Sequence, residues 1–306
     1  MPTKPIDEFI PRKIDNQEIS EILKHLSSLV EEVVNFGSHV FKWGIESIKG
    51  GDENISVFLM YRNIFELIDS ISILIRNSCI EQCNILLRSL FESFLSFNYV
   101  LEKDLKSRGI DFLVWNRHKE IKSLRRFNPN DELSIQYEKK KAKDKIAKNL
   151  PTKKVPDIEK MLENLKNMFD RPSYKDSAAE YQKGKTPRHW YSMRGGPNNM
   201  YQLADHLGFP AQYDILYRSW SELVHGTDIM KNKFSIEGPG EVSFAQMRYP
   251  SGVPNVSSMT ISFGLSVIRI LTQHYIPDKS EEVSNWYKKE IYAAYMNIQN
   301  INIVSV

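Results

Sequence analysis

The stretch Ser78–Val100, SCIEQCNILLRSLFESFLSFNYV, decides the fold class of this 306-residue chain. Its apolar residues return every three to four positions, which is the period of a helix that buries one face. Ser78 and Glu81 have the spacing of a capping box, in which a serine hydroxyl and a glutamate satisfy free backbone amides. We therefore expect a central helix that opens at Ser78 and buries Leu86, Leu87, Leu90, Phe91, Phe94, Leu95 and Val100.

The helical period continues on both sides of this stretch. It predicts helices over residues 16–48, 54–76, 108–127, 156–169, 173–182, 198–207, 211–225, 256–275 and 280–300. Strand-like alternation occurs only around residues 242–244, so we expect an all-α helical bundle with a small hairpin or loop insertion near 234–254. The expected organisation is an N-terminal helix (1–53), a helical core (54–227), and a loop or hairpin with C-terminal helices packing on that core (228–306).

Composition narrows the class of protein. Apolar residues make up 41% of the chain and charged residues 26%, and the formal net charge is +3, as in many globular proteins. The two cysteines, Cys79 and Cys83, lie four apart on one predicted helix, where they form neither a disulfide framework nor a metal site. We therefore expect a reducing, cytoplasmic compartment. The N-terminus lacks the apolar stretch of a signal peptide, and no apolar run approaches a membrane span, so no membrane partner is expected.

The decamer YRSWSELVHG, residues 217–226, holds the main candidate catalytic residues. In a regular helix, successive residues rotate by about 100°, so Arg218, Ser221, Glu222 and His225 fall on one face. An imidazole in the last turn of a helix is favoured in its protonated form by the helix dipole. This arrangement suits an anionic ligand or a developing phosphorane.

Metal-independent RNA cleavage would use these residue types directly. A histidine can take the 2′-hydroxyl proton or protonate the leaving oxygen, and a guanidinium can stabilise the phosphorane. His225 and Arg218 would fill these roles, and Ser221 would orient the imidazole. Two other interpretations stay open: Glu222 neutralises Arg218 through an i,i+4 ion pair, or His225 simply caps its helix and hydrogen-bonds Ser221.

Two further charged residues lie inside the central helix. Arg88 and Glu92 are one helical turn apart among leucines and phenylalanines. Buried charges are costly unless they are paired, so they are expected to form an internal salt bridge. Alternatively, both belong, together with Glu222, to a polar seam that lines the same pocket as His225.

Basic and aromatic residues later in the chain are candidates for RNA contact. The segment 139–154 contains eight lysines and one acid, which indicates either a solvated helix face followed by a loop or a grip on a phosphate backbone. Trp190 and Arg194 would stack on and grip a nucleotide, unless they belong to an ordinary surface loop. The predicted RNA-binding residues are Lys139, Lys140, Lys141, Lys143, Lys145, Trp190 and Arg194.

Two blocks of sequence resemble a known family. They are LRSLFESF at 87–94, and a later block from Trp190 through LADHLG at 203–208 to Tyr217 and SELVHG at 221–226. Together they resemble the uncharacterised bacterial family called domain of unknown function 5677, over roughly residues 55–227. The resemblance implies a helical fold and carries no activity with it.

Arginine, four to six residues, then histidine is similar to the signature of the HEPN ribonucleases, which are helical bundles of toxin and antiviral systems. That resemblance implies cleavage of RNA without a metal and a composite site across a homodimer. The chain has two such spacings, Arg218 with His225 and Arg269 with His274. A separation of five residues turns His274 by about 140° from Arg269, whereas a separation of seven nearly restores register, so the first pair is preferred.

Other catalytic signatures are missing from the sequence. There is no glycine-rich phosphate loop, no His-Glu-x-x-His and no nucleophile elbow, so neither a metal nor another cofactor is expected. The leading hypothesis is a HEPN-like, metal-independent ribonuclease of a bacterial defence or toxin system, acting as a homodimer with a possible regulatory protein partner. The alternative is a non-catalytic helical module that binds a protein or a small ligand through the same polar seam.

Overall fold

The computed structural model describes residues 3–12, 14–152, 154–183, 189–224, 233–238, 241–301 and 303, without the side chains of 222–224 and 237. The chain forms two compact units. The first comprises Met1–Lys49, Val57–Glu102 and Leu203–Val306, and the second comprises Gly50–Ser56 and Lys103–Gln202. In the first unit, the N-terminal and C-terminal helices are joined by helices from the middle of the chain.

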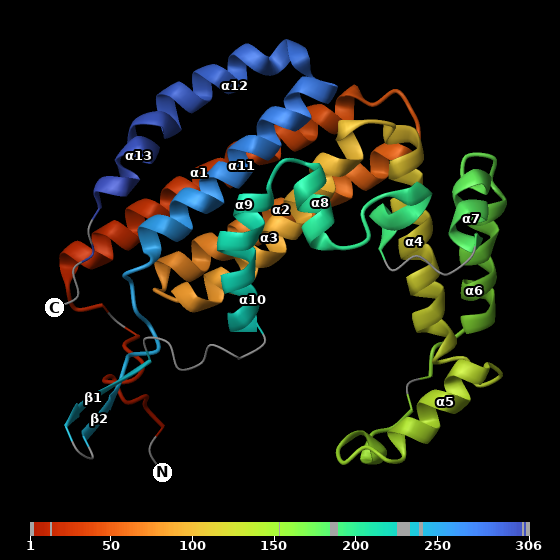
Figure 1. The fold of residues 1–306 in the computed structure, drawn as a ribbon, viewed down its shortest axis with the longest axis horizontal. Coiled ribbons are helices and arrows are strands. Elements are labelled where there is room, and N and C mark those ends of the chain that lie inside the picture. The colour runs from red at the N-terminus through yellow and green to blue at the C-terminus, as the bar shows by residue number, and fades with distance from the viewer. Residues whose placement is uncertain are drawn as a thin grey trace. The chain divides into compact units, whose positions relative to one another are not determined.

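Four long helices form the core of the first unit: α1 (Gln17–Ser47), α2 (Glu53–Arg76), α3 (Ile80–Glu102) and α11 (Val253–Tyr275). Figure 1 shows α1 and α11 running side by side, and α11 also packs on α3. Gly264 of α11 lets the two helices approach, since a Cβ there would lie 2.6 Å from Cγ1 of Val33 on α1. The core is centred on α3, as expected, through the fully buried Leu87, Leu90, Phe91, Leu95 and Phe97.

The start of α3 differs from the capping box that the sequence predicted. Ser78 has a left-handed backbone (φ 57°) and belongs to the end of α2, where its amide donates to the carbonyl of Ile75. The amide of Cys79 donates to the carbonyl of Leu74, which completes a Schellman motif at the end of α2. The Ser78 hydroxyl is buried and has no hydrogen-bond partner among the described residues. The capping-box prediction is therefore wrong, because a tight turn between two helices needs this residue as the end of the first one.

The segment that carries the candidate catalytic motif is an interrupted helix. It consists of α8 (Met200–His206), the short α9 (Pro210–Gln212), a π-helical turn (Tyr213–Tyr217) and α10 (Arg218–Val224). The amide of Arg218 donates to the carbonyl of Tyr213, five residues earlier. A π turn advances less per residue than an α-helix, so the uniform rotation assumed from the sequence does not hold before Arg218. In the first unit, α10 packs on α3.

A hairpin and a broken C-terminal helix complete the first unit. Strands β1 (Phe234–Gly238) and β2 (Glu241–Phe244) pair antiparallel, within the region where the sequence predicts a hairpin. The predicted helix over 280–300 consists of α12 (Ser280–Trp286), a π turn (Tyr287–Ile291), α13 (Tyr292–Asn297) and a 3-10 turn (Ile298–Asn300), preceded by a 3-10 turn at Pro277–Lys279.

The second unit is a smaller helical assembly around α4 (Leu105–Arg125). It contains α5 (Glu132–Lys141), α6 (Ile158–Asn167), α7 (Lys175–Gln182) and 3-10 segments at Ala147–Asn149, Met168–Asp170 and Trp190–Gly195. Helices α6 and α7 pack on α4. Two small apolar clusters join them, one around Ile110, Val114 and Tyr174, the other around Ile121, Ile158 and Leu162.

These elements confirm the all-α prediction. Helices dominate both units, and the two-stranded sheet is the only one among the described residues. Among the described residues, no helix is both long enough and apolar enough to cross a bilayer.

Candidate functional site

The charged pair predicted on the central helix is present on α3. Arg88 and Glu92 lie one turn apart, and Arg88 Nε is 3.3 Å from Glu92 Oε1. The side chain of Arg88 is 19% exposed and that of Glu92 is 38% exposed, so the pair lies at the edge of the core. The predicted salt bridge is confirmed.

Tyr217 joins this pair from the π turn before α10. Its hydroxyl accepts a hydrogen bond from Arg88 Nη2 at 2.9 Å and donates one to Glu92 Oε1 at 2.6 Å. The Arg88 guanidinium carbon also lies 4.8 Å from the centre of the tyrosine ring, within the range of a cation–π contact. Arg88, Glu92 and Tyr217 therefore form a closed three-membered network, called here the seam triad, which links α3 to the motif-bearing segment.

Burial and charge tune the groups of the seam triad. Burial, and then the hydrogen bond to Glu92, raise the pKa of Tyr217 to about 12. Burial alone would lower the pKa of Arg88, but its bonds to Tyr217 and the charge of Glu92 outweigh that effect and raise it. At neutral pH the phenol is therefore protonated and the guanidinium is charged. The triad presents a fixed cation beside a hydroxyl, which is an arrangement suited to an anionic ligand.

Arg218 is placed differently from Arg88. Its side chain is 66% exposed, and its Nε lies 2.9 Å from Asp214 Oδ1, one turn earlier. Its guanidinium is also 5.9 Å from the ring of Tyr213. Asp214 is thus a partner of Arg218. The side chain of Glu222, the partner considered from the sequence, lies outside the described residues. The sequence alone did not single out Asp214, although its position four residues before an arginine is a standard signal for such a pair.

The remaining motif residues are only partly placed. Ser221 is half-buried on α10, one turn after Tyr217. Among the described side chains of the π turn and α10, Tyr217 and Trp220 are buried. His225 lies outside the described residues, and with it the predicted convergence of Arg218 and His225.

Comparison with known proteins identifies the family. Residues 54–241 match the model of a family of unknown function (DUF5677), which is more than half of the chain. The chain belongs to this family. The resemblance noted at 87–94 and at 190–226 is therefore confirmed. No curated protein and no solved structure matches the chain.

The seam triad and the motif segment both lie within the DUF5677 match, as do the residues predicted to contact RNA in the second unit. Two of these, Trp190 and Arg194, are already in contact with other residues of the second unit. Trp190 is 5% exposed, and its ring meets Phe112 edge-on with ring centres 5.5 Å apart. A ring held in this way has no free face on which a nucleobase could stack.

Arg194 is the centre of a second polar cluster. Its Nε and Nη2 bond the two carboxylate oxygens of Asp111 at 2.8 and 3.2 Å, and Nη2 also bonds Asp176 at 2.8 Å and Ser177 at 3.2 Å. The Asp111 side chain is 4% exposed, and burial raises its pKa although Arg194 pulls in the opposite direction. Carboxylates already occupy this guanidinium, so Arg194 is engaged within the second unit.

The basic segment of this DUF5677 member is mostly exposed. Lys139 and Lys140 on α5, and Lys143 and Lys145 after it, all extend into solvent. Lys141 differs: its side chain is 8% exposed, and its Nζ bonds Thr152 Oγ1 at 2.9 Å and lies 3.8 Å from Glu138. Four of the five predicted lysines are therefore available to a polyanion, and the fifth ties the following loop to α5.

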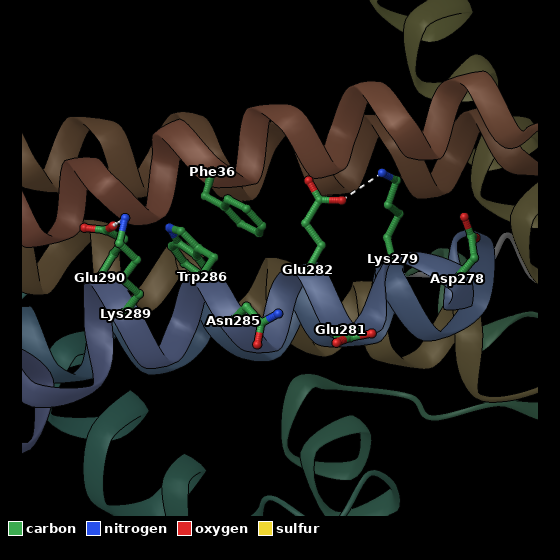
Figure 2. A pocket seen from close by; sticks show the side chains of 9 residues that line it. All are labelled: Phe36, Asp278, Lys279, Glu281, Glu282, Asn285, Trp286, Lys289 and Glu290. Atoms are coloured by element: carbon green, nitrogen blue, oxygen red, sulfur yellow. Dashed lines mark hydrogen bonds and ion pairs between the residues drawn. The ribbon is translucent and has the colours of Figure 1, made fainter.

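A trough between α1 and the α12 region has a volume of about 660 Å³. Figure 2 shows Phe36 and Trp286 against its wall and a row of charged side chains between Asp278 and Glu290. The two rings stack with centres 4.0 Å apart, and Trp286 Nε1 donates to Glu32 at 2.8 Å. Glu282 pairs with Lys279 at 2.7 Å. Since these groups are engaged with one another and the trough is open, the seam triad is the better candidate site.

No group of three or more potential metal ligands occurs among the described residues. The donors at the seam triad are one carboxylate, one phenol and one guanidinium, which do not make a metal site. Its chemistry would be that of proton transfer and charge stabilisation.

Proposed function

We propose that this protein is a metal-independent ribonuclease of the HEPN type. The observation that carries the proposal is the seam triad, in which a half-buried, permanently charged arginine is fixed beside the segment that leads to Ser221 and His225. A cation held in place before the reaction stabilises a developing phosphorane at little reorganisation cost. The proposed setting is a bacterial defence or toxin system in the cytoplasm.

The proposed reaction is an internal transesterification. The 2′-hydroxyl oxygen attacks the adjacent phosphorus, the bond from phosphorus to the 5′-oxygen breaks, and a 2′,3′-cyclic phosphate and a free 5′-hydroxyl result. His225 takes the 2′ proton or supplies the proton for the leaving oxygen. In this proposal, the four-residue spacing of Tyr217, Ser221 and His225 would bring the histidine to the side of the helix that carries Tyr217.

Two arginines could stabilise the phosphorane in this proposal. Arg88 is the better candidate, because the triad restrains its position and only 19% of its side chain is exposed. Arg218 is solvated and paired with Asp214, so it would serve as a secondary contact to the phosphate backbone. The exposed Lys139, Lys140, Lys143 and Lys145 of the second unit would contact the phosphate backbone of the RNA.

The test is RNA cleavage by the purified full-length protein in EDTA, with its activating partner or ligand supplied where one is known. We expect cleavage by the wild type, and a loss of about 10²- to 10⁴-fold in rate for His225→Ala, the usual cost of removing a proton-transfer group. The cleavage rates of Arg88→Ala and Arg218→Ala show which of the two arginines contributes more to catalysis. Arg62→Ala is the matched control for Arg218, because Arg62 is 68% exposed and pairs with Glu66 one turn away on α2.

A wild-type protein that cleaves no RNA, or a His225→Ala variant that cleaves at the wild-type rate, contradicts the proposal. The alternative is then a non-catalytic module that binds a protein or a small ligand. One observation favours it: the hydroxyl of Tyr217 is satisfied on both sides by Arg88 and Glu92, as in a structural network.

A further inference from the structure

The hairpin β1–β2 has two chemically different faces. Phe234 pairs with Phe244 and Ile236 with Val242, while Ser235 pairs with Ser243 between them. Directly paired residues of an antiparallel ladder point to the same side, and neighbours along a strand alternate. One face of the hairpin is therefore entirely apolar, and the hydroxyls of the serine pair, 2.6 Å apart, lie on the other.

The apolar face is exposed to solvent. Ile236 is 69% exposed, Val242 51% and Phe244 65%, and only Phe234 is half-buried. A two-stranded hairpin is marginally stable by itself in water, because it has no second layer to cover such a face. The hairpin of this protein therefore lacks a cover for its apolar side within the described part of the chain.

The exposed apolar surface extends beyond the strands. Met247 and Tyr249 follow β2 and are 66% and 44% exposed. The amide of Met247 donates to the carbonyl of Phe9 at 2.8 Å, which brings the N-terminal segment alongside. In that segment Ile6 is 63% exposed and Phe9 38%. Figure 1 shows the N-terminal segment passing close to the two strands. We call these exposed residues the hairpin patch: Ile6, Phe9, Ile236, Val242, Phe244, Met247 and Tyr249.

The hairpin is held to the bundle at its base. Lys233, just before β1, forms an ion pair with Glu81 on the first turn of α3 at 2.9 Å. The amide of Ala245 donates to the carbonyl of Lys233 at 2.8 Å and extends the ladder by one bond. The patch is therefore presented by an anchored element of the first unit.

We propose that the hairpin patch is the contact surface between two copies of this chain. Seven such side chains offer on the order of 700 Å² of apolar surface, close to the roughly 800 Å² per partner of a standard interface. The core of the face consists of one aromatic and one aliphatic cross-strand pair and carries no charge. It matches a copy of itself across a two-fold axis better than it matches a charged partner, since an isologous contact requires a self-complementary surface.

The experiment measures the mass of the full-length protein across a concentration series by sedimentation velocity. We expect the wild type to be dimeric. Ile236→Ser with Phe244→Ser removes two apolar side chains per copy, and should raise the dimer dissociation constant at least about 100-fold, as for loss of interface hot spots. The matched control is Ser235→Glu with Ser243→Lys, which changes the opposite face and restores a favourable cross-strand pair.

Three results would overturn this assignment. A wild type that stays monomeric shows that the hairpin patch does not join two copies of this chain. A double serine variant that remains dimeric places the interface elsewhere, and a control that becomes monomeric shows that the apolar face is not the determinant. The α-helical circular dichroism spectrum should be the same in all three proteins, because the hairpin lies outside the helical core. The outcome is independent of whether the protein cleaves RNA.

Discussion

The two arginine clusters of this protein are built from similar residues and are satisfied in different ways. Arg194 forks onto Asp111, whose side chain is 4% exposed, and also bonds Asp176. Arg88 has one carboxylate partner, Glu92, and shares it with the hydroxyl of Tyr217. The first cluster neutralises its cation with two anions, and the second leaves its cation with one.

This difference separates a structural arginine from one that is available to a ligand. The bidentate bond of Arg194 compensates the buried negative charge of Asp111. Without that cation, the Asp111 carboxylate would be favoured in its protonated form. The guanidinium of Arg88 is restrained by a neutral hydroxyl and a partly exposed carboxylate, so a bound phosphate would find a positioned cation with bonding capacity. Arginine number and spacing alone do not distinguish these cases.

The largest expected effect is on the Arg194 cluster. Arg194→Ala leaves the Asp111 carboxylate buried without its cation, and breaking a buried pair in this way costs about 3–5 kcal/mol in the free energy of unfolding. Burial already raises the pKa of Asp111, and loss of Arg194 raises it further. A raised folded-state pKa means that stability is present at low pH and is lost as pH rises through that pKa. Chemical denaturation at several pH values should therefore show a deficit that shrinks toward acid pH.

The control for that measurement is Asp176→Asn. Asp176 bonds the same guanidinium, but its side chain is 81% exposed, so its loss should cost little. Equal destabilisation by Arg194→Ala and Asp176→Asn, or a deficit that does not vary with pH, would contradict the role given to the Asp111 pair.

A smaller effect is expected at the seam triad. Tyr217→Phe removes one hydroxyl and both of its hydrogen bonds while keeping the ring over Arg88, which should cost about 1–3 kcal/mol. Two quantities are measured for each variant: the urea concentration at the midpoint of unfolding and the rate of RNA cleavage. If Tyr217 only holds the bundle together, stability falls and the cleavage rate of the folded protein is unchanged. If it positions Arg88, the cleavage rate falls by more than stability explains, and Phe91→Leu, which removes a neighbouring ring from the core, does not reproduce this loss.

The smallest effect on stability is expected at Arg218. Arg218→Gln breaks an exposed i,i+4 pair with Asp214, and such pairs contribute about 0.3–0.5 kcal/mol. The melting temperature should therefore hardly move, as in Arg62→Gln on α2. A large loss of stability at Arg218 would show that its contacts exceed those of a solvated pair and would weaken the contrast with Arg88.

Part of the candidate site could be predicted from the sequence. Charges one turn apart inside an apolar helix predicted the Arg88–Glu92 pair, because a helix brings residues four apart together and burial demands a partner. Tyr217 lies in the decamer at 217–226, but its role could not be predicted, because its contact with Arg88 spans 129 positions. The π turn that aims it at α3 has no sequence signal comparable to a cap or a proline.

Local chemistry determined the helices of this protein, and tertiary packing decided what their polar residues do. The 3.6-residue period of apolar side chains specifies which face of each segment leaves water, so the bundle, the central place of α3 and the hairpin followed from the sequence. Whether Ser78 opens one helix or ends another depended on the tight turn into α3. Whether an arginine is enclosed, as Arg194 is, or partly free, as Arg88 is, depended on carboxylates far away in sequence, because charges are paired through space and periodicity describes only one helix at a time.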